Sequence, residues 1–164
     1  MNITDNFLGK ETYQHIKNIL LGSDIAWYVQ AGKTSASVDD KQLTHLFYSE
    51  NRPNSEFFEL LNPIREKLKV SSILREKANL TFYNNGQDDI FHIDFAEIKS
   101  AKTSIFYLTD RGATIFIING KEKKVEAKEN RMVTFDCNTF HKAVTHKVGD
   151  PFRVVINFNY YKVE

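Results

Sequence analysis

The sequence predicts a mainly β protein of the α+β class, in which N-terminal helices buttress a small jelly roll. Two observations predict this fold. After Ser71, eight short segments have the composition and the alternation of β-strands, and turn residues separate them. Before Ser71, apolar residues recur mainly at helical spacing. We expect one domain over residues 1–164, with a mainly helical part over 1–70 and the jelly-roll core over 71–164.

The N-terminal part is expected to begin with an amphipathic helix over residues 10–21. A short strand is expected over 24–32, and the segment 43–49 is compatible with a second helix. A further helix is expected over 55–70, where apolar residues keep the helical period although Pro63 should bend it.

The expected strands of the second part follow one another at the spacing of an antiparallel sandwich or barrel. They are the segments 78–85, 90–97, 103–110, 113–120, 123–128, 131–136, 141–148 and 152–161. The pair Asn119-Gly120 predicts a two-residue hairpin turn. Because strands and helices do not alternate, a parallel nucleotide-binding sheet is not expected.

The composition excludes several classes of protein. Lys and Arg number 22 against 21 Asp and Glu, so the net charge of +1 does not favour a nucleic-acid partner. The single cysteine, Cys137, excludes an internal disulfide and a multi-cysteine zinc site, and it favours a reducing compartment. No segment has the apolar length that a membrane span needs, so a cytoplasmic protein is expected. The sequence leaves the oligomeric state open.

Two histidines and one aspartate predict a metal site. In the expected strand over 90–97, His92 and Asp94 alternate with three apolar residues, so both side chains leave the same face. His141, at the start of a later strand, is a candidate third ligand. Two imidazoles and one carboxylate on one side of an ion are typical of non-haem Fe(II) oxygen chemistry. The alternative is a solvated strand face without a metal.

Arg153 favours the metal hypothesis. In the last expected strand it shares one face with Val155 and Asn157, and the apolar residues between them take the other face. A buried arginine needs an anion, and its planar fork of donors fits a carboxylate. A dicarboxylate co-substrate would supply one. The alternative is an arginine at a strand end that reaches solvent.

Residues 79–160 resemble the Fe(II)- and 2-oxoglutarate-dependent oxygenases, in particular the prolyl-4-hydroxylase-like branch and its small phage and bacterial members. The resemblance rests on three segments, "YNNGQDDIFHID", "TSIFYLTDRGATIF" and "NRMVTFDCNTFHKAVTHKVGDPFRVVINF". It implies a double-stranded β-helix, the cupin-like form of the jelly roll. It also implies that His92, Asp94 and His141 are the catalytic iron ligands, that Arg153 binds the distal carboxylate of 2-oxoglutarate, and that Tyr83, Thr103, Tyr107 and Asn157 assist that carboxylate or complete its pocket.

The activity that the resemblance implies is a dioxygenase reaction. Fe(II), O₂ and 2-oxoglutarate would hydroxylate an unactivated C–H bond and release succinate and CO₂, with ascorbate as a candidate for keeping the iron reduced. The expected substrate is a peptidyl residue such as proline, and a nucleobase or a free small molecule is the alternative. Two other functions remain open: a cupin-type metal-binding protein without 2-oxoglutarate, and a jelly roll that only binds a partner.

Overall fold

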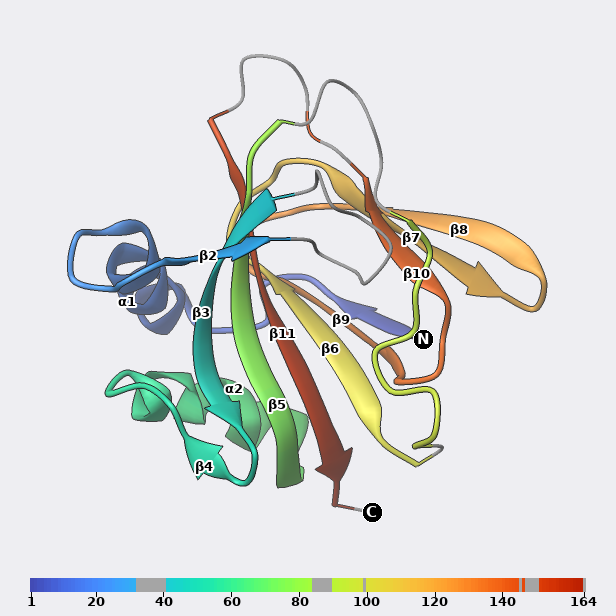
Figure 1. Ribbon diagram of the computed structural model, residues 1–164, viewed down its shortest axis with the longest axis horizontal. Coiled ribbons are helices and arrows are strands. Elements are labelled where there is room, and N and C mark those ends of the chain that lie inside the picture. The colour runs from blue at the N-terminus through green and yellow to red at the C-terminus, as the bar shows by residue number, and fades with distance from the viewer. Residues whose placement is uncertain (32–40, 84–89, 99, 145, 147–150, 164) are drawn as a thin grey trace.

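The computed structural model describes residues 1–31, 41–83, 90–98, 100–144, 146 and 151–163 (Figure 1). In chain order the elements are β1 (Asn2–Thr4), α1 (Lys10–Leu21), β2 (Tyr28–Ala31), β3 (Lys41–Ser49), β4 (Arg52–Pro53), the 3-10 helix η1 (Phe58–Leu61), α2 (Asn62–Leu68), β5 (Val70–Thr81), β6 (Lys102–Tyr107), β7 (Ala113–Ile118), β8 (Lys121–Glu126), β9 (Arg131–Asp136), β10 (His141–Val144) and β11 (Arg153–Lys162).

The described strands form two antiparallel sheets. The larger sheet has the order β1-β9-β6-β11-β5-β3-β2, with β4 paired to β3, and the smaller has the order β10-β7-β8. Figure 1 shows β3, β5, β11 and β6 side by side, with the smaller sheet over their upper right end. This is the mainly β architecture that the sequence predicts, and it is consistent with a double-stranded β-helix.

Alternation along β11 separates a core face from a cavity face. Val154, Ile156 and Phe158 are buried in an apolar cluster that also contains residues of α1 and α2. Arg153 and Asn157 take the opposite face, which is turned toward the smaller sheet. The alternation predicted for this strand is therefore confirmed.

Strand β5 has the same division into two faces. Glu76 is turned toward α2, where its Oε2 lies 2.8 Å from Nη2 of Arg65. Both of these side chains are buried. Because side chains alternate along a strand, the neighbours Arg75 and Lys77 are directed to the cavity face.

The turn predicted at Asn119-Gly120 connects β7 and β8. Both residues have positive φ, 51° at Asn119 and 74° at Gly120. Two successive left-handed residues define the two-residue hairpin turn that matches the twist of paired strands, so this prediction is confirmed.

The N-terminal part was expected to be mainly helical, but its described residues contain four strands as well as helices. The segment 43–49 is the end of β3, not a helix, and it pairs with β5 over most of its length. The helix expected over 55–70 is reduced to η1 and the short α2, since Val70 already belongs to β5. Pro63 lies in the first turn of α2, where its missing N–H costs nothing, rather than bending a longer helix.

The strand expected over 90–97 is absent from the described structure. This segment makes only an isolated antiparallel bridge, between His92 and His141. The expected strands 78–85 and 141–148 end early, at Thr81 and Val144, and parts of both lie outside the described residues. Among the helices that the structure describes, none is long and apolar enough to cross a bilayer.

Candidate active site

A cavity of about 330 Å³ lies between the two sheets. Alternate residues of β5 and β11 line one wall, and residues of β7 and β10 line the other. The segment that follows residue 89 crosses the cavity and contributes His92 and Asp94. The cavity therefore contains both histidines and the aspartate predicted to bind a metal, together with Arg153.

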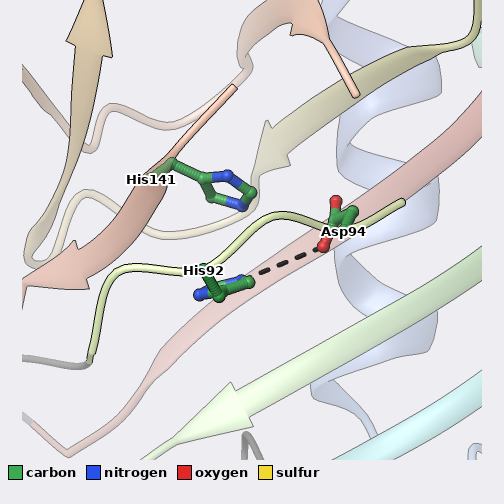
Figure 2. Close-up of side chains that lie close together, drawn as sticks. All are labelled: His92, Asp94 and His141. Carbon is green, nitrogen blue, oxygen red and sulfur yellow. Dashed lines mark ion pairs between the residues drawn. The ribbon is translucent and has the colours of Figure 1, made fainter. Parts of the chain in front are cut away.

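The side chains of His92, Asp94 and His141 converge on one point (Figure 2). One potential ligand atom from each lies within 4.8 Å of those of the other two. The backbones of His92 and His141 exchange two hydrogen bonds, of 2.9 and 3.0 Å, so the bridge between them brings the imidazoles together. The ring centroids are 4.4 Å apart, and Nε2 of His92 is 3.9 Å from Oδ1 of Asp94.

The hydrogen bonds of both imidazoles leave Nε2 available to a metal. Nδ1 of His92 lies 3.2 Å from the carbonyl oxygen of Ile90, and Nδ1 of His141 lies 3.0 Å from that of Thr139. A carbonyl only accepts, so each Nδ1 carries the proton and each Nε2 keeps its lone pair. This is the tautomer that a metal ligand needs.

The surroundings also favour the protonation states that metal binding requires. Burial raises the pKa of Asp94, but His141, Arg75, a hydrogen bond from Asn159 and His92 together bring this pKa below its ordinary value. Burial lowers the pKa of His141, and His92 lowers it further against the opposing effect of Asp94. An ionised carboxylate and a neutral imidazole are the forms that coordinate metals.

Asp94 is held in place by three side chains from the larger sheet. Its Oδ2 accepts hydrogen bonds from Nδ2 of Asn159 at 2.9 Å and from the hydroxyl of Thr103 at 3.2 Å. Arg75 lies 3.5 Å from Oδ1 and donates a hydrogen bond from Nε to Oδ1 of Asn159. The hydroxyl of Thr103 therefore contacts Asp94, and the co-substrate role that the resemblance implies for Thr103 stays a prediction.

Arg153 is buried at the other end of the cavity wall. Its exposed fraction is 4%, and Nη2 donates to the hydroxyl of Thr114 at 3.3 Å. That hydroxyl also bonds the phenol of Tyr107 at 2.7 Å, whose ring lies 5.6 Å from the guanidinium carbon. Gly112 has a φ of 73°, and a Cβ there would lie 2.6 Å from the carbonyl oxygen of Val144 and 3.1 Å from Cδ of Arg153. A side chain at position 112 would therefore clash with the backbone of Val144 and crowd the arginine.

The other site residues proposed from the sequence differ in how close they lie to the cavity. Asn157 lines the cavity on the same face as Arg153, and its Oδ1 has no hydrogen-bond partner among the described residues. The ring of Tyr107 lies beside the guanidinium of Arg153. The ring of Tyr83 packs 6.3 Å from that of His146, and Tyr83 does not contribute to the described lining of the cavity. The roles of these residues stay predictions.

Several residues of this site are not identified from the sequence, among them Asn159, Arg75 and Lys77. Extending the alternation of the last strand by two residues beyond Asn157 reaches Asn159, so a signal for it was present. Arg75 and Lys77 precede the strand expected over 78–85, and the earlier start of β5 places them on the cavity wall.

Replacing Asn159 with leucine is expected to weaken iron binding. The substitution removes one of the hydrogen bonds that orient Asp94, and losses of such orienting groups typically cost about 10- to 100-fold in metal affinity. The measurement is the dissociation constant for Fe(II) under anaerobic conditions. Ser104→Ala is the matched control, because Ser104 is equally buried but bonds Thr134 and Tyr160 instead. Equal iron affinity in both variants would show that Asn159 does not position Asp94.

Comparison with known proteins adds evidence on the fold. A scan against protein-family models finds no match, and neither does a search of curated sequences. Three solved structures illustrate the structural matches, each covering 98% of this chain. A prolyl hydroxylase from Trichoplax adhaerens, in complex with a peptide fragment of the hypoxia inducible factor oxygen degradation domain, matches over 83% of its length, with a TM-score of 0.68 and 14% identity.

The other two matches are bacterial. An oxidoreductase of the 2OG-Fe(II) oxygenase family from Burkholderia pseudomallei matches over 84% of its length, with a TM-score of 0.72 and 11% identity. A prolyl-4-hydroxylase from Pseudomonas putida matches over 92% of its length, with a TM-score of 0.60 and 13% identity. Identities this low establish a common fold and no more. The chain thus has the double-stranded β-helix fold of the 2-oxoglutarate- and Fe(II)-dependent oxygenases, with a His-Asp-His group placed in its cavity.

Proposed function

We propose that this protein is an Fe(II)- and 2-oxoglutarate-dependent dioxygenase that hydroxylates an unactivated C–H bond and releases succinate and CO₂. One observation carries the proposal. A single cavity is lined both by the group His92, Asp94 and His141 and by the buried Arg153. The two histidines and the aspartate suit a divalent iron ion, and the arginine suits the free carboxylate of a dicarboxylic acid.

The donor set fits Fe(II). Two imidazole nitrogens and one carboxylate are the ligands of the facial triad, which leaves further coordination positions open. Asp94 and His141 are largely buried, so an ion would offset the cost of keeping the carboxylate charged in the cavity. When bound, iron with 2-oxoglutarate would supply the activation of O₂.

The chain's own residues would bind the iron, orient its ligands and keep water away from them. His92 and His141 would present Nε2 to the ion, and Asp94 would present an oxygen while Oδ2 keeps its bonds to Asn159 and Thr103. Phe116 and Phe135 pack with ring centroids 6.1 and 4.9 Å from that of His141 and shield it from water.

Arg153 would bind the distal carboxylate of 2-oxoglutarate. The hydroxyl of Thr114 accepts a hydrogen bond from the guanidinium of Arg153, and the ring of Tyr107 packs against the face of this guanidinium. The guanidinium is therefore oriented before the co-substrate binds. Burial raises the pKa of Tyr107 despite the opposing effects of Arg153 and Thr114, so its hydroxyl remains protonated and able to donate. Tyr107 would thus be a second donor to the same carboxylate.

Arg153 also weighs against a cupin-type metal-binding protein. Such a protein needs the metal ligands but has no use for a buried guanidinium in the same cavity. Within the proposed class, the candidate substrates are a peptidyl proline, a nucleobase and a free small molecule.

Anaerobic titration tests this function. Adding 2-oxoglutarate to the Fe(II)-loaded protein should produce the weak visible charge-transfer absorption of a chelated 2-oxo acid, and admitting O₂ should then yield succinate. Zn(II)-loaded protein is the control, since zinc has no redox chemistry and should give neither signal. Iron binding without the absorption band would instead identify a cupin-type metal protein, and no iron binding would identify a jelly roll without a metal.

A further inference from the structure

The cavity is more positively charged than the proposed iron and 2-oxoglutarate require. Its described lining contains three cationic side chains, Arg153, Arg75 and Lys77, but one carboxylate, Asp94. If the proposed function holds, the two positive charges of Fe(II) are matched by the two negative charges of 2-oxoglutarate. Within the described lining, the two further cationic side chains, Arg75 and Lys77, then outnumber the one carboxylate, Asp94.

Lys77 contributes to this surplus from a position away from Arg153. In the pairing of β5 with β11, Arg153 lies opposite Thr81 and Lys77 lies opposite Asn157. Four residues along a strand correspond to about 13 Å. Cations therefore stand at two places along the cavity wall, and one dicarboxylate held by Arg153 and the metal does not account for both.

The ammonium group of Lys77 has no ion pair with a carboxylate in the described part of the chain. Its hydrogen-bond partner is Oε1 of Gln30 at 3.4 Å, a long and neutral contact. Burial and, to a smaller extent, the charge of Arg75 lower the pKa of Lys77 to about 8, against the opposing effect of Asp94. Keeping a cation here costs free energy, which a bound anion would offset.

Two amide oxygens next to Lys77 are also without partners. Oδ1 of Asn79, two residues along β5, and Oδ1 of Asn157, opposite Lys77 on β11, are buried and accept no hydrogen bond from the described residues. Buried acceptors are normally satisfied, so these two favour a ligand that carries N–H donors. An acidic group near an amine would satisfy the lysine and the amides together.

We propose that the substrate is a small amino-carboxylate such as a free amino acid, with its acid group bound by Lys77 and Arg75 and its amine by Asn79 and Asn157. The inference rests on the proposed function and names its substrate class. A small molecule of this kind also suits a cavity of about 330 Å³ that has to hold 2-oxoglutarate as well. A proline inside a peptide has neither charge, so the cavity disfavours the peptidyl substrate expected from the sequence.

Equilibrium binding separates this inference from catalysis. The probes are the free L-amino acids and their primary amides, titrated calorimetrically into protein loaded with Zn(II) and 2-oxoglutarate, where no turnover occurs. At least one free acid should bind, and its amide should bind about tenfold to a hundredfold more weakly, because the amide lacks the charge. The same acid should stimulate succinate release from the Fe(II) protein.

Variants of Lys77 assign the effect to this residue. Lys77→Met keeps the length of the side chain and should weaken binding of the acid by about tenfold to a hundredfold, whereas Lys77→Arg should retain it. Lys123→Met, on the exposed face of β8, is the control for removing a lysine charge. Zn(II) and 2-oxoglutarate affinities should be the same in Lys77→Met and wild type.

Three results would overturn the inference: no free acid binds, an acid and its amide bind equally, or Lys77→Met weakens 2-oxoglutarate binding and leaves acid binding intact. The last result would assign Lys77 to the co-substrate. Failure of wild-type protein to bind 2-oxoglutarate would refute the proposed function instead. In that case, titration of the acids into the Zn(II) protein alone would still decide the role of Lys77.

Discussion

The variant His141→Ala should lose iron binding and keep its fold. His141 supplies one of three ligand atoms that lie within 4.8 Å of one another, so its removal leaves two. The loss of affinity should exceed the roughly 10- to 100-fold that follows from changing groups that only orient a ligand. Iron content after anaerobic loading and dialysis measures this loss. His92→Ala and Asp94→Ala are expected to behave in the same way.

Thermal melting separates a lost ligand from a lost fold. An ion that binds only the folded state stabilises it by mass action, so Fe(II) should raise the melting temperature of the wild type but not that of His141→Ala. His15→Ala is the matched control, because it also removes an imidazole but from the exposed side of α1. If His141→Ala retained stoichiometric iron with wild-type affinity, the assignment of His141 as a ligand would be wrong.

Much of the larger sheet could be predicted from the sequence because both of its faces are specified. In β11, apolar residues facing the helices alternate with residues facing the cavity, and this period of two has no helical equivalent. Strands β6 and β9 of this sheet, and β7 of the smaller sheet, are predicted within a few residues for a related reason, since turn residues mark the ends of their apolar runs.

The secondary structure of two short segments is predicted wrongly from the sequence. The segment 43–49 has an apolar run that suits a helix or a strand, and its pairing with β5, about 30 residues away, decides for a strand. The segment 90–97 has the alternation of a strand, but it makes one bridge with His141 and its Asp94 side chain turns to partners on the larger sheet. Long-range pairing of this kind leaves no trace in a local period.

The candidate site divides in a similar way. His92, Asp94, His141 and Arg153 could be proposed together because their residue types are costly to bury without a ligand. The residues that support them could not be found so directly. The resemblance implies a co-substrate role for Thr103, but nothing in the local sequence indicates that its hydroxyl also contacts Asp94. Arg75 and Lys77 precede the strand expected over 78–85, and they face the cavity only because β5 begins earlier, at Val70.

Arg153→Ala should weaken 2-oxoglutarate binding by about thirtyfold or more while iron binding stays intact. Removing one partner of a buried charge pair costs about 2–5 kcal/mol, and about 1.4 kcal/mol corresponds to a tenfold change in the dissociation constant. Iron should be unaffected because Arg153 is not one of the proposed metal ligands, and it donates hydrogen bonds to Thr114 and to the carbonyl of Ala113. Arg153→Lys should lose less affinity for 2-oxoglutarate, since lysine keeps the positive charge but lacks the planar fork of donors.

The comparison of two 2-oxo acids isolates the contact that Arg153 is expected to make. 2-Oxobutyrate retains the 2-oxo acid group of 2-oxoglutarate but lacks the distal carboxylate. Its affinity for the Fe(II) protein should therefore be nearly the same in wild type and Arg153→Ala, whereas the affinity for 2-oxoglutarate falls. Arg111→Ala, which removes a nearby arginine bonded to the carbonyl of Phe152, is the control for a change in surface charge. If Arg153→Ala lowered the affinity for both acids equally, Arg153 would support the shape of the cavity rather than bind the carboxylate. The proposed function would then lose the residue that distinguishes it from a cupin-type metal protein.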